Sequence, residues 1–589
     1  MKSVKFYILC VFLLFILIFP AAASTDDSTE IQIILNQKIP MRDSIQLAAR
    51  IWKPAEMKEP LPVIFALTPY VADEAQEKGM FFARNGYVYL QVDCRGRGNS
   101  EGEFVPNERE GRDGADIVEW IARQPWCDGQ VAMRGGSYRG FDQWQTLKEM
   151  PPSLKTIVPT AAAYPGIDIP APCNIYMTYF PQWHALVAGK TVNWNLFYDS
   201  QHWNDKYYIL YKNYTPFKKL AEKLGTNRKI FERWLSHPTY DDYWQSLTPS
   251  KIDYAQMNIP ILTITGYFDT DQPGAMTYYL EHMECGTAEG KEKHYIITGP
   301  WSHAGTRTPI KKLASLVFGD NSVLDIDKLH CEWYDWILKG GKKPDFLKKR
   351  VCYYMMDENE WKYVDRLEDI ASGSDVWYLS SDDGKPHDSF HSGSLKKSLD
   401  NKHKTPDVFR HDPLELMPKE DFFKEKQTQI YMHQRELFPD EKLIYHSPPL
   451  EEDLEVAGYV RLSAYIEMNV PDADLGVSLF EIRPDGSHIF LGQSLLRARY
   501  RKSLSKAELV KPGEINVYEF NRFYFFARRL RKGSRLRLVL YGINSPDWEK
   551  NYNSGGVIAD ETEKDARVAI IKLYHDENHP SRLELPIKK

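Results

Sequence analysis

Between about residue 32 and residue 160, apolar and polar positions follow a pattern typical of strands separated by helices. GADIVEWIARQ (114–124) has helical spacing, with Ile117, Trp120 and Ile121 on one face. The predicted strands are IQIILNQ and SIQLAARIWKP, paired through a turn near residues 41–44, and the buried runs LPVIFAL (61–67) and GYVYLQVD (86–93). This alternation predicts a mainly parallel sheet covered by helices.

A short strand, QVAMR (130–134), is predicted after a turn at Asp128-Gly129, and it runs into the glycine-rich stretch RGGSYRG (134–140). The next residues, FDQWQTLKEM, predict a helix. A strand, a tight turn and a helix form the context in which hydrolases expose a nucleophilic serine. Ser137 is therefore either such a nucleophile or one more serine in a glycine-rich loop.

From about residue 163 to 255 the pattern is helical, rich in aromatic residues and without a strand signal, which indicates an inserted helical segment. The sheet pattern then resumes with strand 259–269, helix 274–283, strand 294–300 and helix 326–338. From about residue 350, short alternating runs between turns indicate an antiparallel β-sandwich of the jelly-roll type.

The whole chain therefore predicts an α/β fold: a mainly parallel sheet domain with a helical insertion, followed by a C-terminal β-sandwich. The expected segments are a signal peptide (1–23), the first part of the sheet domain (32–162), the helical insertion, or cap (163–255), the second part of the sheet domain (256–345) and the β-sandwich or jelly roll (350–589). A chain of 589 residues is too long for one hydrophobic core, which also favours several domains.

The N-terminus, MKSVKFYILCVFLLFILIFPAAAS, has the form of a targeting segment. Lys2 and Lys5 precede an apolar stretch, and Ala21-Ala22-Ala23 offers small residues for cleavage. The apolar stretch is shorter than the roughly 20 residues that span a bilayer. We therefore expect export to the periplasm or outside the cell after cleavage, with retention as an anchor as the alternative, and no stable membrane insertion after cleavage.

Composition narrows the classes of partner. The net charge is −6, or −8 without Lys2 and Lys5, which argues against nucleic acid. Basic runs such as RARYRK (497–502) and RRLRKGSRLRL (528–538) alternate with apolar residues, as the solvent faces of strands do. Six cysteines remain after cleavage, few and scattered, so we expect buried free thiols with at most one disulfide.

Two residues after the cap have the types and the order that a serine nucleophile needs. Asp269 follows the strand ILTITG, and His303 follows the strand HYIITG, so both are expected at the same edge of the sheet. The order Ser, Asp, His is that of α/β-hydrolases. Each residue alone has a plain alternative, a helix-capping Asp or a loop His, but the three together in this context favour a catalytic set.

Stabilising an oxyanion takes two hydrogen-bond donors. The backbone N–H of Tyr138, directly after the nucleophile, supplies one. The second usually comes from the loop after an early strand, here ALTPY (66–70), where Pro69 has no N–H. The Tyr70 hydroxyl is the natural candidate, with a tyrosine that merely closes the loop as the alternative.

No metal or organic cofactor is expected. DTDQPG (269–274) resembles the start of a calcium loop, but Pro273 and Leu280 stand where oxygen ligands belong. HMEC (282–285) has ligand spacing without a second pair nearby. Arg95-Gly96-Arg97-Gly98 is a glycine-rich loop that we interpret as structural.

Several of these segments together resemble the family of bacterial cocaine esterase, α-amino acid ester hydrolase and X-Pro dipeptidyl-peptidase. The resemblance rests on VDCRGRGNSEGEF, EWIARQPWCDGQVAMRGGSYRG, GYFDTDQPGA, GPWSHAG and YDWILKGG, and on PDADLGVSLFEIRPDG and KGSRLRLVLYG in the C-terminal part. It covers nearly the whole mature chain. It implies an α/β-hydrolase domain with an inserted helical cap, followed by a jelly-roll β-sandwich. It also implies Ser137 as nucleophile, His303 as base, Asp269 as orienting acid, and an oxyanion hole formed by Tyr70 and the Tyr138 amide.

The resemblance is less complete for the substrate. Family members that prefer a free α-amino group have two acids shortly after the catalytic Asp, whereas this chain has Asp271 and then the amide Gln272. Asp271 is a candidate for binding an ammonium group, with a helix N-cap as the alternative.

The sequence thus predicts an exported serine hydrolase that cleaves small esters or amides through a covalent acyl-enzyme. An X-Pro dipeptidyl peptidase that acts on short peptides is the first alternative. An inactive glycan-binding protein is the second. The physiological substrate and a homo-oligomeric state both stay open.

Overall fold

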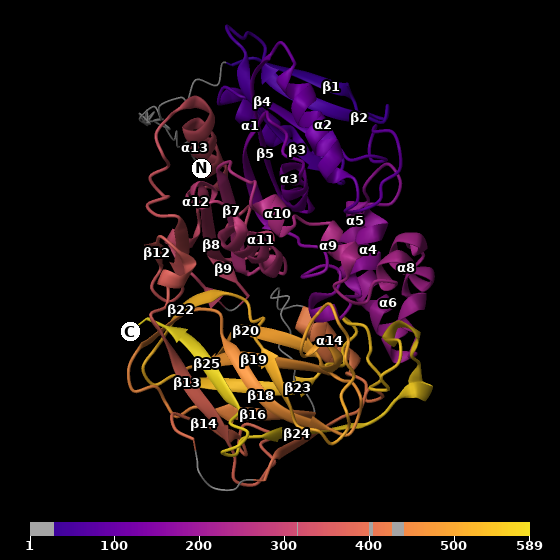
Figure 1. Cartoon of the computed structure of the whole chain (residues 1–589), viewed down its shortest axis with the longest axis vertical. Helices are drawn as coiled ribbons and strands as arrows, with labels where there is room; N and C mark the ends of the chain where they lie inside the picture. Colours follow the sequence, from indigo (N-terminus) through magenta and orange to yellow (C-terminus); the bar gives the residue numbers. More distant parts are fainter. Residues whose placement is uncertain (1–28, 315, 400–404, 427–440, 589) are drawn as a thin grey trace, which may run out of the picture.

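The computed structural model describes residues 29–314, 316–399, 405–426 and 441–588, so the predicted signal segment lies outside the described residues. Figure 1 shows the molecule with a sheet-and-helix part at the top, a group of helices at one side and a β-sandwich below. The chain enters the upper part, leaves it for the lateral helices, returns, and ends in the sandwich.

The upper part is built on one ten-stranded sheet in the order β1-β2-β4-β3-β5-β6-β7-β8-β11-β12. All neighbouring pairs from β4 to β11 are parallel, which confirms the predicted mainly parallel sheet. The strands are β1 (Ile31–Pro40), β2 (Gln46–Pro54), β3 (Leu61–Thr68), β4 (Val88–Asp93), β5 (Cys127–Ser137), β6 (Leu154–Ala162), β7 (Ile261–Phe268), β8 (His294–Ser302), β11 (Val351–Met355) and β12 (Glu360–Val364).

Helices cover both faces of this sheet, and each face has its own hydrophobic core. On one face, Ile117 of α2, Trp144 of α3 and Tyr278 of α11 pack against the sheet. On the other face, Phe82 of α1 and Trp333 of α13 do so. The helices are α1 (Gln76–Arg84), α2 (Glu110–Ala122), α3 (Tyr138–Lys148), α11 (Gln272–Cys285), α12 (Ala288–Glu292) and α13 (Ile326–Lys339).

Two details of this sheet differ from the sequence expectation. Asp128-Gly129 is not a turn before the strand but lies inside β5, where Gly129 has a φ of 88° and the pairing with β3 shifts register. The segment predicted to begin the jelly roll at residue 350 instead supplies β11 and β12 to the first sheet, because β11 pairs with β8 in parallel. The hydrolase sheet therefore extends to Val364.

Between β6 and β7 the chain forms the helical cap, which has a hydrophobic core of its own. Aromatic side chains dominate that core, among them Phe180, Trp183, Phe231 and Trp234. The helices are α4 (Tyr179–Leu186), α5 (Trp194–Phe197), α6 (Ser200–Lys212), α7 (Leu220–Leu224), α8 (Arg228–Leu235), α9 (Asp242–Ser246) and α10 (Lys251–Tyr254).

The C-terminal part is a β-sandwich of mostly antiparallel strands around an extensive apolar core. Besides the sandwich, the chain has the short helix α14 (Lys419–Lys426) and the small pair β9 (Lys312–Leu313) and β10 (Leu316–Val317). The sandwich strands are β13 (Gly373–Ser380), β14 (Gly393–Lys396), β15 (Asp407–His411), β16 (Lys442–His446), β17 (Leu454–Gly458), β18 (Arg461–Met468), β19 (Asp474–Ile482), β20 (His488–Arg497), β21 (Asn516–Phe520), β22 (Phe526–Leu530), β23 (Arg535–Gly542), β24 (Ala569–Tyr574) and β25 (Arg582–Ile587).

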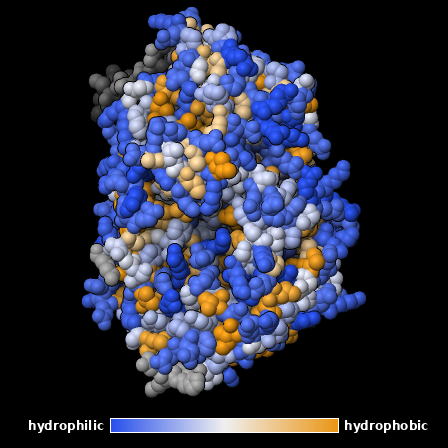
Figure 2. Space-filling view, in the orientation of Figure 1, coloured by the Kyte–Doolittle hydropathy of each residue, from blue (hydrophilic) through white to orange (hydrophobic). Residues whose placement is uncertain are grey.

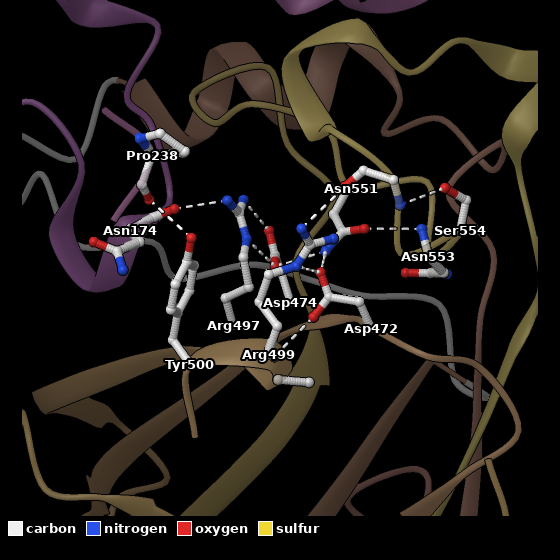
Figure 3. A network of polar contacts seen from close by, with 12 residues as sticks. Asn174, Pro238, Asp472, Asp474, Arg497, Arg499, Tyr500, Asn551, Asn553 and Ser554 are labelled. Carbon is white, nitrogen blue, oxygen red and sulfur yellow. Dashed lines mark hydrogen bonds and ion pairs between the residues drawn. The ribbon is translucent and has the colours of Figure 1, made fainter. Parts of the chain in front are cut away.

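A buried polar network joins the sandwich to the start of the cap, and Figure 3 shows it from close by. Arg497 donates to Asp474 at 2.8 Å, to Glu549 at 2.7 Å and to the backbone oxygen of Asn174 at 2.6 Å. Glu549 in turn accepts from the backbone N–H of Tyr176 at 3.0 Å. The cap is therefore anchored to the sandwich by buried charge-assisted hydrogen bonds.

Two buried arginines, one of them in this network, correct an expectation about the basic runs. The arginines of 497–502 and 528–538 were expected on solvent faces, yet Arg497 and Arg528 are each only 3% exposed. Arg528 pairs with Glu481 at 2.7 Å and Asp357 at 2.9 Å. The alternation of arginines with apolar residues places the arginines on one face of the strand. Acidic side chains from elsewhere in the chain cover that face, so it is not exposed to solvent.

Arg497→Met is expected to lower thermal stability by several degrees, because it leaves Asp474 and Glu549 buried without their cation. Breaking a buried ion pair from one side typically costs about 3–5 kcal/mol. The matched control is Arg366→Met, whose pair with Asp369 is exposed and screened by solvent, so that its loss is expected to leave the midpoint nearly unchanged. Thermal unfolding of both variants followed by circular dichroism checks this. Equal midpoints for the two variants would contradict it.

The surface and the thiols complete the description. On the face drawn in Figure 2, hydrophilic side chains predominate and apolar ones gather only in small groups. No helix among the described residues is both long and apolar enough to cross a bilayer. Within the described residues all six cysteines are free, and all but Cys285 are buried.

Candidate functional site

Three strands of the parallel sheet bring the predicted catalytic residues to one edge. Ser137 is the last residue of β5, Asp269 follows β7 directly, and His303 follows β8 directly. Since the carboxyl ends of parallel strands lie at the same edge of a sheet, side chains at these positions converge. Ser137 and His303 line one cavity there.

Ser137 has a strained backbone, with φ 64° and ψ −129°, between the end of β5 and the first turn of α3. A non-glycine residue rarely adopts such angles, and nucleophiles on strand-to-helix turns are a known case. The turn leaves no room for a side chain at Gly140, where a Cβ would lie 2.8 Å from the backbone Cα of Ala162. At Gly136 a Cβ would lie 2.6 Å from Arg307 Nη1 and would displace that guanidinium.

His303 is held by a carboxylate beneath it. Its Nδ1 lies 2.7 Å from Asp269 Oδ1, and Asp269 is fully buried. Burial lowers the pKa of His303, but the charges of Asp269 and Asp271 outweigh it, so the pKa lies above its usual value of 6.5. This contact leaves Nε2 as the ring nitrogen that is free to exchange a proton with a neighbouring group.

Asp271 is a second acid beside the histidine. Its Oδ2 lies 3.8 Å from His303 Nδ1, and it occupies the N-cap position of α11 without a side-chain capping bond, so it does not act as the cap considered above. Burial raises its pKa to about 6. Asp269, Asp271 and His303 bring ligand-type atoms within 4.8 Å of one another, but a cation bound there would compete with the His303–Asp269 hydrogen bond.

Tyr70 lies in the same cavity as Ser137. Its hydroxyl oxygen accepts a hydrogen bond from Trp183 Nε1 at 3.2 Å, and burial raises its pKa to about 12, so the phenol keeps its proton at neutral pH. The loop that carries it is fixed by Arg97, which donates to the Pro69 carbonyl at 2.7 Å. Arg97 also donates to cap carbonyls such as Val187 O at 2.8 Å, in keeping with the structural interpretation of its loop.

Tyr138 is the first residue of α3, so its N–H is one of the amides at a helix N-terminus that have no partner within the helix. Its ring stacks on Trp183 with centroids 5.5 Å apart. Its hydroxyl donates to Glu110 and accepts from the backbone N–H of Asn107 at 2.7 Å. These contacts fix the residue whose amide points toward the edge where Ser137 stands.

The cavity has a volume of about 100 Å³. Its wall on the cap side is apolar and aromatic, and its floor carries Ser137, His303, Asp271 and Tyr70. The apolar wall is formed by Ala163, Ile169, Tyr179, Phe180, Trp183 and Trp234. Since a cavity of about 150 Å³ holds benzene, the space suits an acyl group of a few carbon atoms.

Other residues at the site were not singled out in the sequence. The aromatic wall could not be assigned to a pocket, because most cap aromatics simply fill the cap core. Arg307 was also missed, although its position four residues after His303 in the sequence places it close to the catalytic candidates. Gln272, which stands in place of the second acid, contacts no substrate space: it bonds the backbone of Gly266 and Phe525. Asp168 instead supplies a buried acid near Asp271, and burial raises its pKa.

Two family models match consecutive parts of the chain. Residues 43–305 match the X-Pro dipeptidyl-peptidase (S15 family), and residues 346–584 match the X-Pro dipeptidyl-peptidase C-terminal non-catalytic domain. The chain belongs to the S15 family. The chain is accordingly a serine hydrolase with an α/β-hydrolase domain and a C-terminal β-sandwich, as the sequence predicted.

Named relatives of this S15-family chain include esterases and a peptidase. Cocaine esterase of Rhodococcus sp. (strain MB1 Bresler) is 25% identical over 590 residues, which cover 94% of this chain and 98% of the relative. A solved α-amino acid ester hydrolase superposes with a TM-score of 0.81 at 20% identity, covering 97% of this chain and 99% of its own. An aminopeptidase from a Thaumarchaeota archaeon of marine sediment gives 0.79 at 20% identity, covering 96% and 98%. At these identities the two structures show a shared fold.

Proposed function

We propose that the protein hydrolyses esters or amides of small acyl groups through a Ser137–His303–Asp269 triad. The observation that carries the proposal is the 2.7 Å contact between His303 Nδ1 and Asp269, in the cavity edge where the strained Ser137 stands. Asp269 fixes the tautomer of His303 and stabilises the imidazolium. The aromatic wall and the volume of about 100 Å³ favour a short or flat acyl group.

In the first step His303 Nε2 takes the proton of the Ser137 hydroxyl while Oγ attacks the substrate carbonyl carbon. The resulting oxyanion accepts hydrogen bonds from the Tyr138 amide and the Tyr70 hydroxyl. Imidazolium then protonates the leaving alkoxide or amine, and an acyl-enzyme remains. Water, deprotonated by His303, attacks the acyl carbonyl, and the acid leaves as Ser137 regains its proton.

Reaction with a fluorophosphonate probe tests the nucleophile directly. Mass spectrometry of the intact protein and its peptides is expected to place one adduct on Ser137, and no adduct on Ser137→Ala. A folded wild-type protein that takes up no probe would overturn the triad and favour a glycan-binding protein without turnover. Turnover of a panel of short-chain esters then measures the acyl preference.

A dipeptidyl peptidase is the second candidate function, and a specific observation favours it: Asp271 is a buried acid that lines the cavity beside Ser137 and His303, with a second buried acid, Asp168, behind it. Such acids suit the ammonium group of a free N-terminus. Turnover of Ala-Pro-anilide and its N-acetyl derivative separates the two functions. Near-complete loss on acetylation indicates a peptidase, and turnover of esters without an amino group indicates an esterase.

We also propose export. Its support is the N-terminal run of lysines, apolar residues and small residues. Expression of the full chain with detection of the mature N-terminus by sequencing tests it. An intact Met1 in the fractionated cell would overturn cleavage.

The pH dependence of kcat/KM is expected to show an acid limb that reports His303, because only the neutral imidazole accepts the serine proton. Its pKa is raised above 6.5, so activity is lost as pH falls through that raised value. Asp271→Asn removes a negative charge that stabilises the imidazolium, so the limb is expected to move to lower pH. The control is Asp320→Asn at an exposed site. An unchanged limb in Asp271→Asn would contradict the coupling.

A further inference from the structure

Two arginines beside the catalytic edge have no hydrogen-bond or ion-pair partner for their guanidinium groups within the part of the chain that the structure describes. Arg139 lies in the first turn of α3, two residues after Ser137, and Arg307 lies four residues after His303. Among the described residues, neither guanidinium makes a hydrogen bond, and no carboxylate oxygen comes within the 4.0 Å of an ion pair. Nε of Arg139 and Nη1 of Arg307 are shielded from solvent and still unpartnered. Both side chains are otherwise only half-buried.

Both guanidinium groups lie near Tyr70, behind the residues that line the cavity of Ser137. Cζ of Arg139 lies 5.9 Å from the centre of the Tyr70 ring. Nη1 of Arg307 occupies the space next to Gly136, 2.6 Å from where a Cβ would be, so the missing side chain of that glycine admits the guanidinium. Burial, and after it the neighbouring charge of Arg139, lower the pKa of Arg307, as expected for two cations that lie close together.

Other charges near the pair do not neutralise it by direct contact. Asp269 and Asp271 act on Arg307 from a distance, but Asp269 is bonded to His303 and Asp271 lies beside the same ring. A pair of unpartnered arginines costs stability unless something else accepts their hydrogen bonds. Their planar N–H groups fit the two oxygens of a carboxylate, which they bind in a bidentate manner.

We propose that Arg139 and Arg307 bind a carboxylate of the substrate, so that the enzyme acts on esters or amides that carry an anionic group close to the scissile bond. This inference rests on the proposed function, because it places the anion relative to Ser137. The carboxylate belongs either to the acyl group, as in a dicarboxylic acid monoester, or to the leaving group. The chemistry of recognition is the same in both cases, and the experiment separates them.

Two isosteric pairs of substrates test the proposal. For the acyl side, ethyl hydrogen glutarate is compared with ethyl 4-carbamoylbutanoate. For the leaving-group side, 4-acetoxybenzoate is compared with 4-acetoxybenzamide. In one pair, kcat/KM of the wild type is expected to favour the anion by about tenfold or more, and that pair assigns the side. A wild type that prefers the neutral member in both pairs would overturn the proposal.

Arg139→Gln and Arg307→Gln are each expected to remove most of that preference, a loss of about tenfold or more, as is usual when a charge-assisted hydrogen bond is lost. Arg228→Gln on the exposed face of α8 removes the same charge at a distant site and is expected to keep the preference. An equal loss for the anionic and the neutral substrate would assign the arginines to general stabilisation of the oxyanion and overturn the carboxylate site.

A binding experiment keeps the proposal testable even if no ester is turned over. Ser137→Ala is titrated calorimetrically with glutarate and 4-hydroxybenzoate, and with their neutral analogues glutaramide and 4-hydroxybenzamide as controls. One of the two anions is expected to bind, and Arg307→Gln in the same background is expected to weaken that binding at least tenfold. If neither anion binds, the proposed carboxylate site is overturned. Failure of the triad is reported separately, by the fluorophosphonate adduct at Ser137.

Discussion

Ser137→Ala is expected to lower kcat for ester hydrolysis by about 10⁶-fold, the loss seen when the nucleophile of a catalytic triad is removed. The reason is that no acyl-enzyme forms, so catalysis retains only what binding and the oxyanion donors supply. Alanine accepts the φ of 64° no worse than serine does, so the fold is expected to persist. Steady-state turnover and the thermal midpoint, measured together, check both statements.

The control for this prediction is Ser200→Ala, which removes a hydroxyl from an exposed position at the start of α6. It is expected to retain wild-type turnover. Residual activity in Ser137→Ala above about one part in 10⁴ would contradict the role of Ser137, provided that the preparation is free of contaminating esterase.

Tyr70→Phe is expected to lower kcat by about 10²- to 10³-fold with a small effect on KM, which is the usual cost of losing one oxyanion donor. The geometry gives the reason: Trp183 Nε1 donates to the Tyr70 oxygen at 3.2 Å, so the phenolic proton is directed elsewhere and is available to an oxyanion. Since burial holds the phenol pKa near 12, that proton is present throughout the working range of pH.

Kinetics of the Tyr70→Phe variant with an activated and an unactivated ester measure this effect. Tyr198→Phe removes the hydroxyl of a tyrosine that is 70% exposed on the cap and serves as the control. Near-wild-type kcat in Tyr70→Phe would exclude the Tyr70 hydroxyl as the second oxyanion donor, so that another group would have to act beside the Tyr138 amide. A loss confined to KM would make Tyr70 a binding residue instead.

The parallel sheet, the position of the cap and the placement of Ser137, Asp269 and His303 at one edge of the sheet were predictable from the sequence. Each depends on local signals, namely buried β-rich runs, helical periodicity and the order of residues after strands. In a parallel sheet the carboxyl ends of the strands lie at one edge, so the location of residues that follow these strands can be predicted without knowing any side-chain contact. This is why the catalytic candidates could be named before the fold was known.

The features that escaped prediction depend on contacts between distant parts of the chain. Alternation places Arg497 on one face of a strand, but only Asp474 and Glu549 decide that this face is buried. The strands from Val351 to Val364 come after the change in composition at residues 339–341 and are short, like the sandwich strands. The parallel pairing of β11 with β8 assigns them to the first sheet. The bulge at Gly129 likewise depends on the partner strand β3.

The anchoring of the cap has a consequence for how substrates reach the nucleophile. Arg497 and Glu549 hold the backbone at Asn174 and Tyr176, and the Tyr500 hydroxyl bonds the carbonyl of Pro238 near the far end of the cap. A roof tied at both ends to the β-sandwich does not swing open like a lipase lid. We therefore expect the space above Ser137 to keep its size when substrate binds, so that the sandwich, by holding the cap in place, limits the size of the acyl group.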